Sequence, residues 1–134
     1  MDSLSVEKRS WNMSRIRSKD TKPEKAVRSL LHSLGYRFRL HVKKLPGCPD
    51  IVLAKHKTVI FIHGCFWHRH AGCKYAYLPK SKKAFWRNKF QQNRNRDEVV
   101  MKEIMNLGWS VYIIWECETK NTARLQQKVE SFFT

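Results

Sequence analysis

The chain contains 134 residues with a formal net charge of +16, a length that suits one domain and a charge that calls for a polyanionic partner. Its hydrophobic fraction of 42% fits a globular fold rather than a disordered tail. The longest apolar runs have the length of strands, and the start of the chain lacks the apolar stretch of a signal peptide. We therefore expect a cytosolic protein without a membrane span.

Apolar spacing and turn residues predict, in chain order, a basic helical segment at 6–18, a helix at 21–34, strands at 36–40, 50–54 and 58–62, an irregular loop at 63–82, a helix at 83–107, a strand at 109–115 and a helix at 121–133. Because a helix joins the strands at 58–62 and 109–115, we expect these strands to be parallel neighbours. The sequence thus predicts an α/β fold, with a mixed central sheet flanked by helices on both sides, in a single domain covering residues 1–134.

The positive charge gathers in two zones. Residues 8–44 hold 12 Lys/Arg residues against two acids, and residues 74–96 hold eight with no acid. Aromatic residues such as Trp11 and Phe85 lie inside these zones, which favours nucleic acid over the alternatives of a ribosomal-type protein or a membrane-surface binder. Two basic zones on a nearly neutral remainder predict a DNA duplex held from two sides.

The irregular loop contains residue types that bind metals. Cys65, His70 and Cys73 lie within nine residues, and Cys117 follows the last strand. Three thiolates and one imidazole suit a closed, structural zinc site, because no coordination position stays open for water. Cys48 could replace one of these ligands. The alternative to a zinc site is that the four cysteines are ordinary thiols and the histidine a surface side chain.

Three residues near this loop suit phosphodiester hydrolysis. Asp50 begins a buried strand beside a basic surface and is a candidate magnesium ligand, although it could instead close a turn. His63 and His68 flank the candidate zinc ligand Cys65, and a neutral imidazole can take a proton from water near pH 7. A single loop histidine would more often be a solvated side chain.

Several aromatic residues lie close to the candidate ligands. Phe66 and Trp67 follow Cys65 and could either pack in the core or wedge into a base stack. Trp86, in the second basic zone, could add a third wedge, although a core position is the simpler interpretation. On the long helix, Asp97 interrupts an apolar stripe and so needs a partner. It could form a local hydrogen bond or pair with Arg94 or Arg96, or it could orient a catalytic histidine or lie near the metal.

At these residues the chain resembles the very-short-patch-repair (Vsr) endonucleases. The most specific match is the run His63-Gly64-Cys65-Phe66-Trp67-His68. The other matching stretches are Asn12-Met13, Asp20-Thr21, Glu24-Lys25, Leu45-Pro46-Gly47 with Pro49-Asp50, Val59-Ile60-Phe61, Phe85-Trp86, Arg96-Asp97, and Leu107-Gly108-Trp109 with Trp115-Glu116-Cys117. The resemblance implies a restriction-endonuclease-like core and an enzyme that nicks DNA on the 5′ side of the thymine in a T:G mismatch, the lesion left by deamination of 5-methylcytosine.

The resemblance also implies roles for individual residues. Asp50 and the backbone carbonyl of Ile62, where the family usually has Thr, would bind magnesium, expected as two ions. His68 would act as general base, and His63 would support the scissile phosphate. The residues implied for one zinc ion are Cys65, His70, Cys73 and Cys117. Those implied to enter the DNA are Met13, Phe66, Trp67 and Trp86, and the acids implied near the active centre are Glu24 and Asp97.

The chain departs from the family pattern at a few positions. The stretch from His70 to Cys73 is one residue longer, Arg69 and Ala71 thin the His-rich run, and Cys48 stands where arginine is common. We expect a basic DNA-contacting segment at 1–20 and a monomer acting on double-stranded DNA in the bacterial cytoplasm, with the nucleoid when bound.

Two other functions compete with the mismatch endonuclease. A related restriction-type nuclease of different specificity would have less use for the wedge residues. A non-catalytic, zinc-stapled DNA-binding module would leave Asp50, His63 and His68 together without a purpose.

Overall fold

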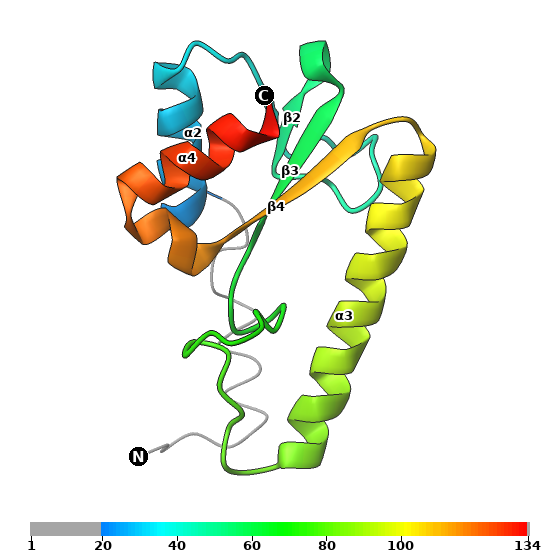
Figure 1. The fold of residues 1–134 in the computed structure, drawn as a ribbon. Coiled ribbons are helices and arrows are strands. Elements are labelled where there is room, and N and C mark those ends of the chain that lie inside the picture. Colours follow the sequence, from blue (N-terminus) through cyan, green and yellow to red (C-terminus); the bar gives the residue numbers. More distant parts are fainter. Residues whose placement is uncertain (1–19, 134) are drawn as a thin grey trace.

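The computed structural model describes residues 20–133, so the basic segment at 6–18, with Met13, lies outside the described residues. The elements in chain order are α2 (Lys22–Ser33), β1 (Arg39–Leu40), β2 (Ile51–Leu53), η1 (Ala54–His56), β3 (Thr58–His63), α3 (Lys83–Asn106), β4 (Ser110–Trp115), η2 (Glu116–Lys120) and α4 (Thr122–Phe132). Figure 1 shows their arrangement. Every element expected after residue 20 is present, although the strand expected at 36–40 is reduced to the two residues of β1.

The four strands form one mixed sheet in the order β1-β2-β3-β4. The pairs β1/β2 and β2/β3 are antiparallel, whereas β3 and β4 are parallel, with Ile60 opposite Tyr112. The parallel pairing confirms the crossover predicted from the helix between these two strands. The short link from β2 to β3 closes through η1 and Lys57, which adopts a left-handed conformation.

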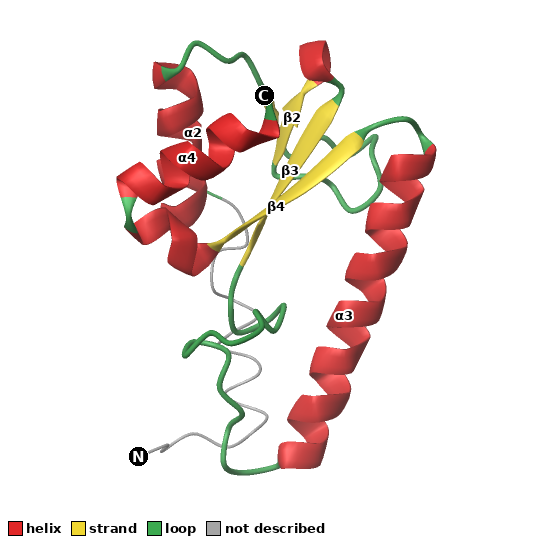
Figure 2. Ribbon diagram, viewed as in Figure 1, coloured by secondary structure: helices red, strands yellow, loops and turns green. Residues whose placement is uncertain are grey.

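Helices cover both faces of the sheet, as the sequence predicted. Figure 2 shows α2 and α4 on one side and α3 on the other. Leu31 and Val129 pack with Ile60 on the first side, while Ile104 packs with Val59 on the second. Because β2 and β3 are buried on both faces, their sequences are continuously apolar instead of alternating. None of the helices within residues 20–133 is long and apolar enough to cross a membrane.

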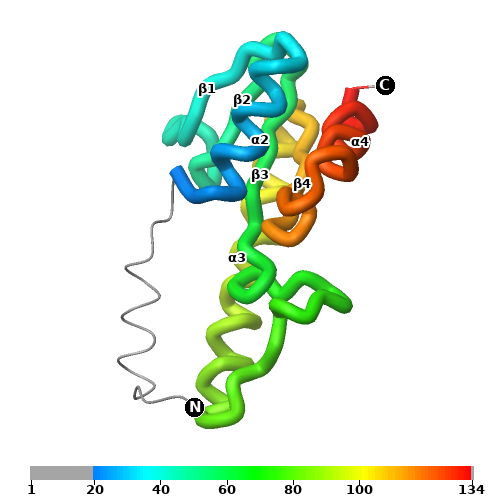
Figure 3. The backbone as a smooth tube through the Cα atoms, turned by 90° about the vertical axis from the view of Figure 1, so that its left-hand side faces the viewer, coloured from blue at the N-terminus to red at the C-terminus, as the bar shows by residue number. Residues whose placement is uncertain are grey.

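Two helices bring polar residues to one edge of the sheet. The Thr21 side chain caps α2 by accepting the Glu24 N–H at 3.4 Å, and the Glu24 carboxylate accepts the Asp20 N–H at 2.9 Å. In a capping box the Glu24 carboxylate would accept the N–H of the N-cap residue Thr21, whereas here it accepts the N–H of the residue before it. The 24-residue helix α3 extends beyond the sheet and runs beside the loop that follows β3, as Figures 1 and 3 show.

Candidate active site

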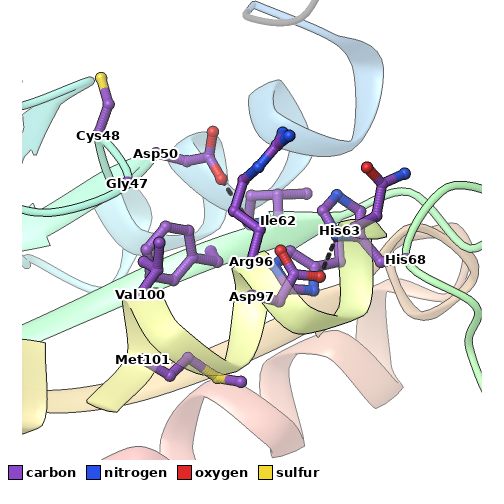
Figure 4. Close-up of a pocket in the computed structure, with 12 residues that line it drawn as sticks. Gly47, Cys48, Asp50, Ile62, His63, His68, Arg96, Asp97, Val100 and Met101 are labelled. Carbon is purple, nitrogen blue, oxygen red and sulfur yellow. Dashed lines mark hydrogen bonds and ion pairs between the residues drawn. The ribbon is translucent and has the colours of Figure 1, made fainter. Parts of the chain in front are cut away.

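A pocket of about 270 Å³ lies between the sheet and α3, where the start of β2 meets the end of β3. These two ends share one edge of the sheet because β2 and β3 are antiparallel. Residues of both ends and of α3 line the pocket: Gly47, Cys48, Asp50, Phe61, Ile62, His63, His68, Asn93, Arg96, Asp97, Val100 and Met101. Figure 4 shows Asp50, His63, His68 and Asp97 gathered around it. The sequence singled out these four residues separately, and the fold brings them together.

Asp50 is held against the end of β3. Its Oδ2 atom accepts the Ile62 N–H at 2.7 Å. The N–H and C=O of one strand residue point to the same side, so the Ile62 carbonyl faces the side that Asp50 occupies. Burial and, to a smaller extent, the charge of Glu24 raise the pKa of Asp50 to about 6, although the hydrogen bond from the Ile62 N–H acts to lower it. A carboxylate and a backbone carbonyl are hard oxygen donors, and a cation beside them would offset the cost of burying the charge. These residues therefore fit a magnesium ion.

The two histidines stack on each other at the end of β3. The rings of His63 and His68 lie 3.8 Å apart, centroid to centroid, with 9° between their planes. His63 is buried, and burial together with the nearby His68 lowers its pKa to about 4. The His63 imidazole is therefore neutral at pH 7 and can donate or accept a hydrogen bond there.

Asp97 on α3 contacts His68. The His68 Nδ1 and Asp97 Oδ2 atoms are 2.6 Å apart, and the carboxylate can only accept, so Nδ1 carries the hydrogen. This arrangement leaves Nε2 of His68 as the proton acceptor. Asp97 thus contacts a histidine of the loop, and the expectation that it orients a catalytic histidine stays a prediction.

The candidate zinc ligands lie together beside the pocket. Ligand atoms of Cys65, His70, Cys73 and Cys117 all lie within 4.8 Å of one another. The Nδ1 atom of His70 is 3.4 Å from the Cys117 sulfur and 3.7 Å from the Cys65 sulfur. Zinc bonds of about 2.3 Å to sulfur and about 2.0 Å to nitrogen give tetrahedral edges of about 3.5–3.8 Å. The four residues thus fit a closed zinc site, and Cys48 lines the pocket instead.

One side chain connects the candidate zinc site with the histidine stack. The ring of Trp115 stacks on His70 with centroids 4.3 Å apart and meets His63 edge-on at 5.4 Å.

Burial raises the pKa of the Cys65 thiol to about 12. The thiol therefore keeps its proton unless a cation binds, and metal binding must release protons here.

Comparisons with known proteins identify relatives of this chain. A family model described as DNA mismatch endonuclease Vsr matches residues 1–74. The type II nicking enzyme V.XorIIP of Xanthomonas oryzae pv. oryzae is 49% identical over 130 residues, which cover 97% of this chain and 95% of the relative. The DNA mismatch endonuclease Vsr of Escherichia coli K12 is 41% identical over 117 residues, which cover 87% and 74%. The type II nicking enzyme V.NmeAIP of Neisseria meningitidis is 44% identical over 128 residues, which cover 96% and 91%.

The chain belongs to the DNA mismatch endonuclease Vsr family. Membership makes it a DNA endonuclease, a hydrolase whose partner is DNA. A nuclease of this family also requires a divalent metal, which agrees with the oxygen donors at Asp50 and Ile62.

In this Vsr-family chain Glu24 belongs to a buried network next to Asp50. Its Oε2 atom accepts from Arg28 at 2.8 Å and lies 3.4 Å from Nε2 of His41. Arg28 also pairs with Asp20 at 2.8 Å, and the His41 N–H donates to the Asp50 carbonyl at 3.2 Å. Sequence reasoning missed Arg28 and His41. The spacing of four residues from Glu24 to Arg28 on one helix was a usable signal, whereas His41 gave none.

The aromatic residues predicted to enter DNA form a cluster, here called the aromatic cluster, of Phe66, Trp67, Tyr77, Trp86 and Phe90. Phe66 lies 5.1 Å from both Tyr77 and Phe90, and Trp86 stacks on Phe90 at 5.8 Å. Trp86 is fully buried, while Phe66 and Trp67 are half-buried. In this structure Trp86 therefore has the core position that was the simpler interpretation, and its entry into DNA stays a prediction.

Proposed function

We propose that this chain nicks one strand of duplex DNA on the 5′ side of the thymine in a T:G mismatch, and so begins very-short-patch repair. The observation that carries the proposal is the convergence of Asp50, His63 and the His68–Asp97 pair on one pocket. The name of the E. coli relative, a DNA mismatch endonuclease, supports the choice of substrate. We also propose a restriction-endonuclease-like core, consistent with the mixed four-stranded sheet that has helices on both faces.

Each of these side chains has a separate role in the proposed hydrolysis. Nε2 of His68 removes a proton from the attacking water, while Asp97 holds the ring and stabilises the imidazolium that forms. The water oxygen bonds to phosphorus as the bond to the leaving nucleotide oxygen breaks, and that oxygen takes up a proton. His63, neutral and stacked on His68, would hydrogen-bond the scissile phosphate.

Asp50 and the Ile62 carbonyl would hold magnesium, which we propose as two ions. When bound, magnesium supplies positive charge at the phosphate and makes the attacking water more acidic. A backbone carbonyl serves this purpose whatever the side chain, so isoleucine in place of the family's usual threonine leaves the ligand available. Glu24 and its partner Arg28 set the charge around Asp50 from the side of α2.

We assign the four-residue Cys/His site to one structural zinc ion. The site ties the loop after β3 to the end of β4, and that loop carries His68, Phe66 and Trp67. DNA would be contacted by the basic residues of the two charged zones, including those before residue 20. Phe66, Trp67, Trp86 and Met13 would open the mismatched step, which is less costly to unstack than a matched one.

The deciding experiment compares a T:G duplex with the matched T:A duplex, each labelled on the thymine strand, with and without magnesium. We expect one nick, 5′ of the thymine, only with the mismatch and the metal. Asp50→Ala and His68→Ala should abolish nicking and keep most DNA binding, while Glu98→Gln, at an exposed position of α3 outside the pocket lining, is the control. Equal nicking of both duplexes would instead indicate a related nuclease of different specificity, and binding without nicking would indicate a DNA-binding module.

A further inference from the structure

Arg69 connects three parts of the aromatic cluster. Its guanidinium donates to the backbone carbonyls of Phe66 at 3.2 Å, Ala76 at 2.8 Å and Tyr77 at 3.0 Å. The same group lies 4.0 Å from the centroid of the Phe90 ring on α3. One side chain therefore joins the turn that carries Phe66, the irregular segment at 76–77 and the long helix.

The backbone at Arg69 adopts an unfavourable conformation, whose cost the contacts of its side chain can offset. Its φ of 56° is left-handed, a conformation that costs about 1 kcal/mol or more for a residue other than glycine. Two backbone hydrogen bonds flank it, from the His68 N–H to Gly64 and from the His70 N–H to Cys65. This conformational cost falls on a residue between the proposed base His68 and the candidate zinc ligand His70.

We infer that Arg69 is a positioning residue for mismatch recognition, which fastens the Phe66–Trp67 turn to residues 76–77 and α3 before DNA binds. The inference rests on the proposed function, in which Phe66 and Trp67 open the mismatched step. Rings that are already fixed lose less freedom on entering DNA, so fastening the turn improves affinity for the lesion. The planar guanidinium can serve several carbonyls and stack on Phe90 together, which a lysine ammonium cannot.

The test uses Arg69→Lys, which keeps the charge, and Arg69→Gly, which relieves the left-handed backbone but removes every contact. We expect both variants to raise KM for the T:G duplex about tenfold and to reduce the preference for T:G over T:A, because the turn loses its preorganised state. The value of kcat at saturating DNA should change less than about threefold, since His68 keeps its contact with Asp97. Arg124→Lys and Arg124→Ala, at an exposed position of α4 outside both basic zones, are the matched controls.

A second measurement on the free protein separates this inference from the proposed function. Acrylamide quenching of tryptophan emission should increase in Arg69→Lys and Arg69→Gly, because Trp67 and Trp86 lie in the cluster that Arg69 holds, while the zinc content stays at the wild-type value. Wild-type protein without a preference for T:G would refute the proposed function and leave the quenching result to decide on Arg69.

Three outcomes would overturn the role of Arg69. Unchanged quenching and unchanged discrimination in both variants would show that its contacts are dispensable. Full activity in Arg69→Lys with equal weakening on both duplexes in Arg69→Gly would identify Arg69 as a simple phosphate contact. A loss of zinc together with a collapse of kcat in both variants would make Arg69 a structural residue of the zinc loop.

Discussion

The His68 Nδ1 atom lies 2.6 Å from the Asp97 Oδ2 atom, which joins the loop after β3 to the middle of α3 across 29 positions of sequence. The carboxylate fixes the tautomer of His68 that leaves Nε2 free to accept a proton. An asparagine at position 97 could donate to Nδ1 instead and would then favour the opposite tautomer. The contact therefore has a direct consequence for the rate of nicking.

We expect Asp97→Asn to lower kcat for T:G nicking by about 100-fold or more, because the base would present the wrong nitrogen to water. Single-turnover nicking at saturating DNA measures this rate. Glu98→Gln, at the exposed neighbouring position of α3, is the control and should stay near the wild-type rate. The double variant His68→Ala/Asp97→Asn should be little slower than His68→Ala alone, since the two residues act as a unit. Additive losses in the double variant would argue that Asp97 acts independently of His68.

Asp50 should reduce the stability of the metal-free protein at neutral pH. Its pKa in the fold is about 6, above the ordinary value of 3.8, so the unfolded chain ionises this group more readily. The resulting loss of stability begins as the pH rises through 3.8 and is complete above about 6. Asp50→Asn, which keeps an acceptor for the Ile62 N–H, should raise the melting temperature by a few degrees above pH 6 and leave it unchanged near pH 4.

Melting curves between pH 4 and 8 without added magnesium test this prediction, and Glu103→Gln on the exposed side of α3 serves as control. The same Asp50→Asn protein should not nick DNA. A lower melting temperature than wild type at pH 7 would mean that Asp50 stabilises the free fold, and the pocket would not be arranged for a cation.

The zinc assignment predicts one ion per chain that depends on four particular residues. Cys73→Ser and Cys117→Ser should lose the metal and lower the melting temperature, because the loop after β3 is no longer tied to the end of β4. Cys48→Ser should keep both the zinc content and the melting temperature, since Cys48 lines the pocket instead. Elemental analysis with thermal denaturation measures both quantities. Retention of zinc by Cys117→Ser would require another fourth ligand.

The sequence predicted the parts of this protein that depend on local pattern. The periodicity of residues 83–107 and the apolar runs on either side determine β3, α3 and β4 and therefore their parallel pairing. The interruption of the apolar stripe at Asp97 predicted that this carboxylate has a partner, and the structure identifies His68 of the loop as that partner. Local sequence pattern was thus sufficient to predict the elements that form the pocket.

Contacts between distant segments without periodicity could not be predicted. The pairing of Arg28 with His41 joins a helix to a bend that follows β1, and nothing in either segment indicates the other. Residues 36–38 alternate as a strand would, yet only Arg39 and Leu40 pair with β2. Cys48 and Cys65 could not be told apart as ligands until the fold placed one in the pocket and the other beside His70.

Trp86 provides the last prediction, because it is fully buried and its indole N–H has no hydrogen-bond partner within the structure described for residues 20–133. Such a donor costs about 1–3 kcal/mol, and losing the larger ring of tryptophan costs a similar amount through the cavity it leaves. In Trp86→Phe these effects oppose each other, so we expect the melting temperature to change by only a few degrees. Phenylalanine also keeps the ring stacked on Phe90.

If Trp86 leaves the aromatic cluster to enter DNA, Trp86→Phe should reduce the preference for T:G over T:A about tenfold, because a smaller ring stacks less well on the opened bases. Nicking rates on the two duplexes measure the preference, and Phe85→Leu at the exposed neighbouring position is the control. Wild-type discrimination by Trp86→Phe with an unchanged melting temperature would make Trp86 a core residue only. Recognition of the mismatch would then be left to Phe66 and Trp67, which are already half-exposed at the surface of the loop.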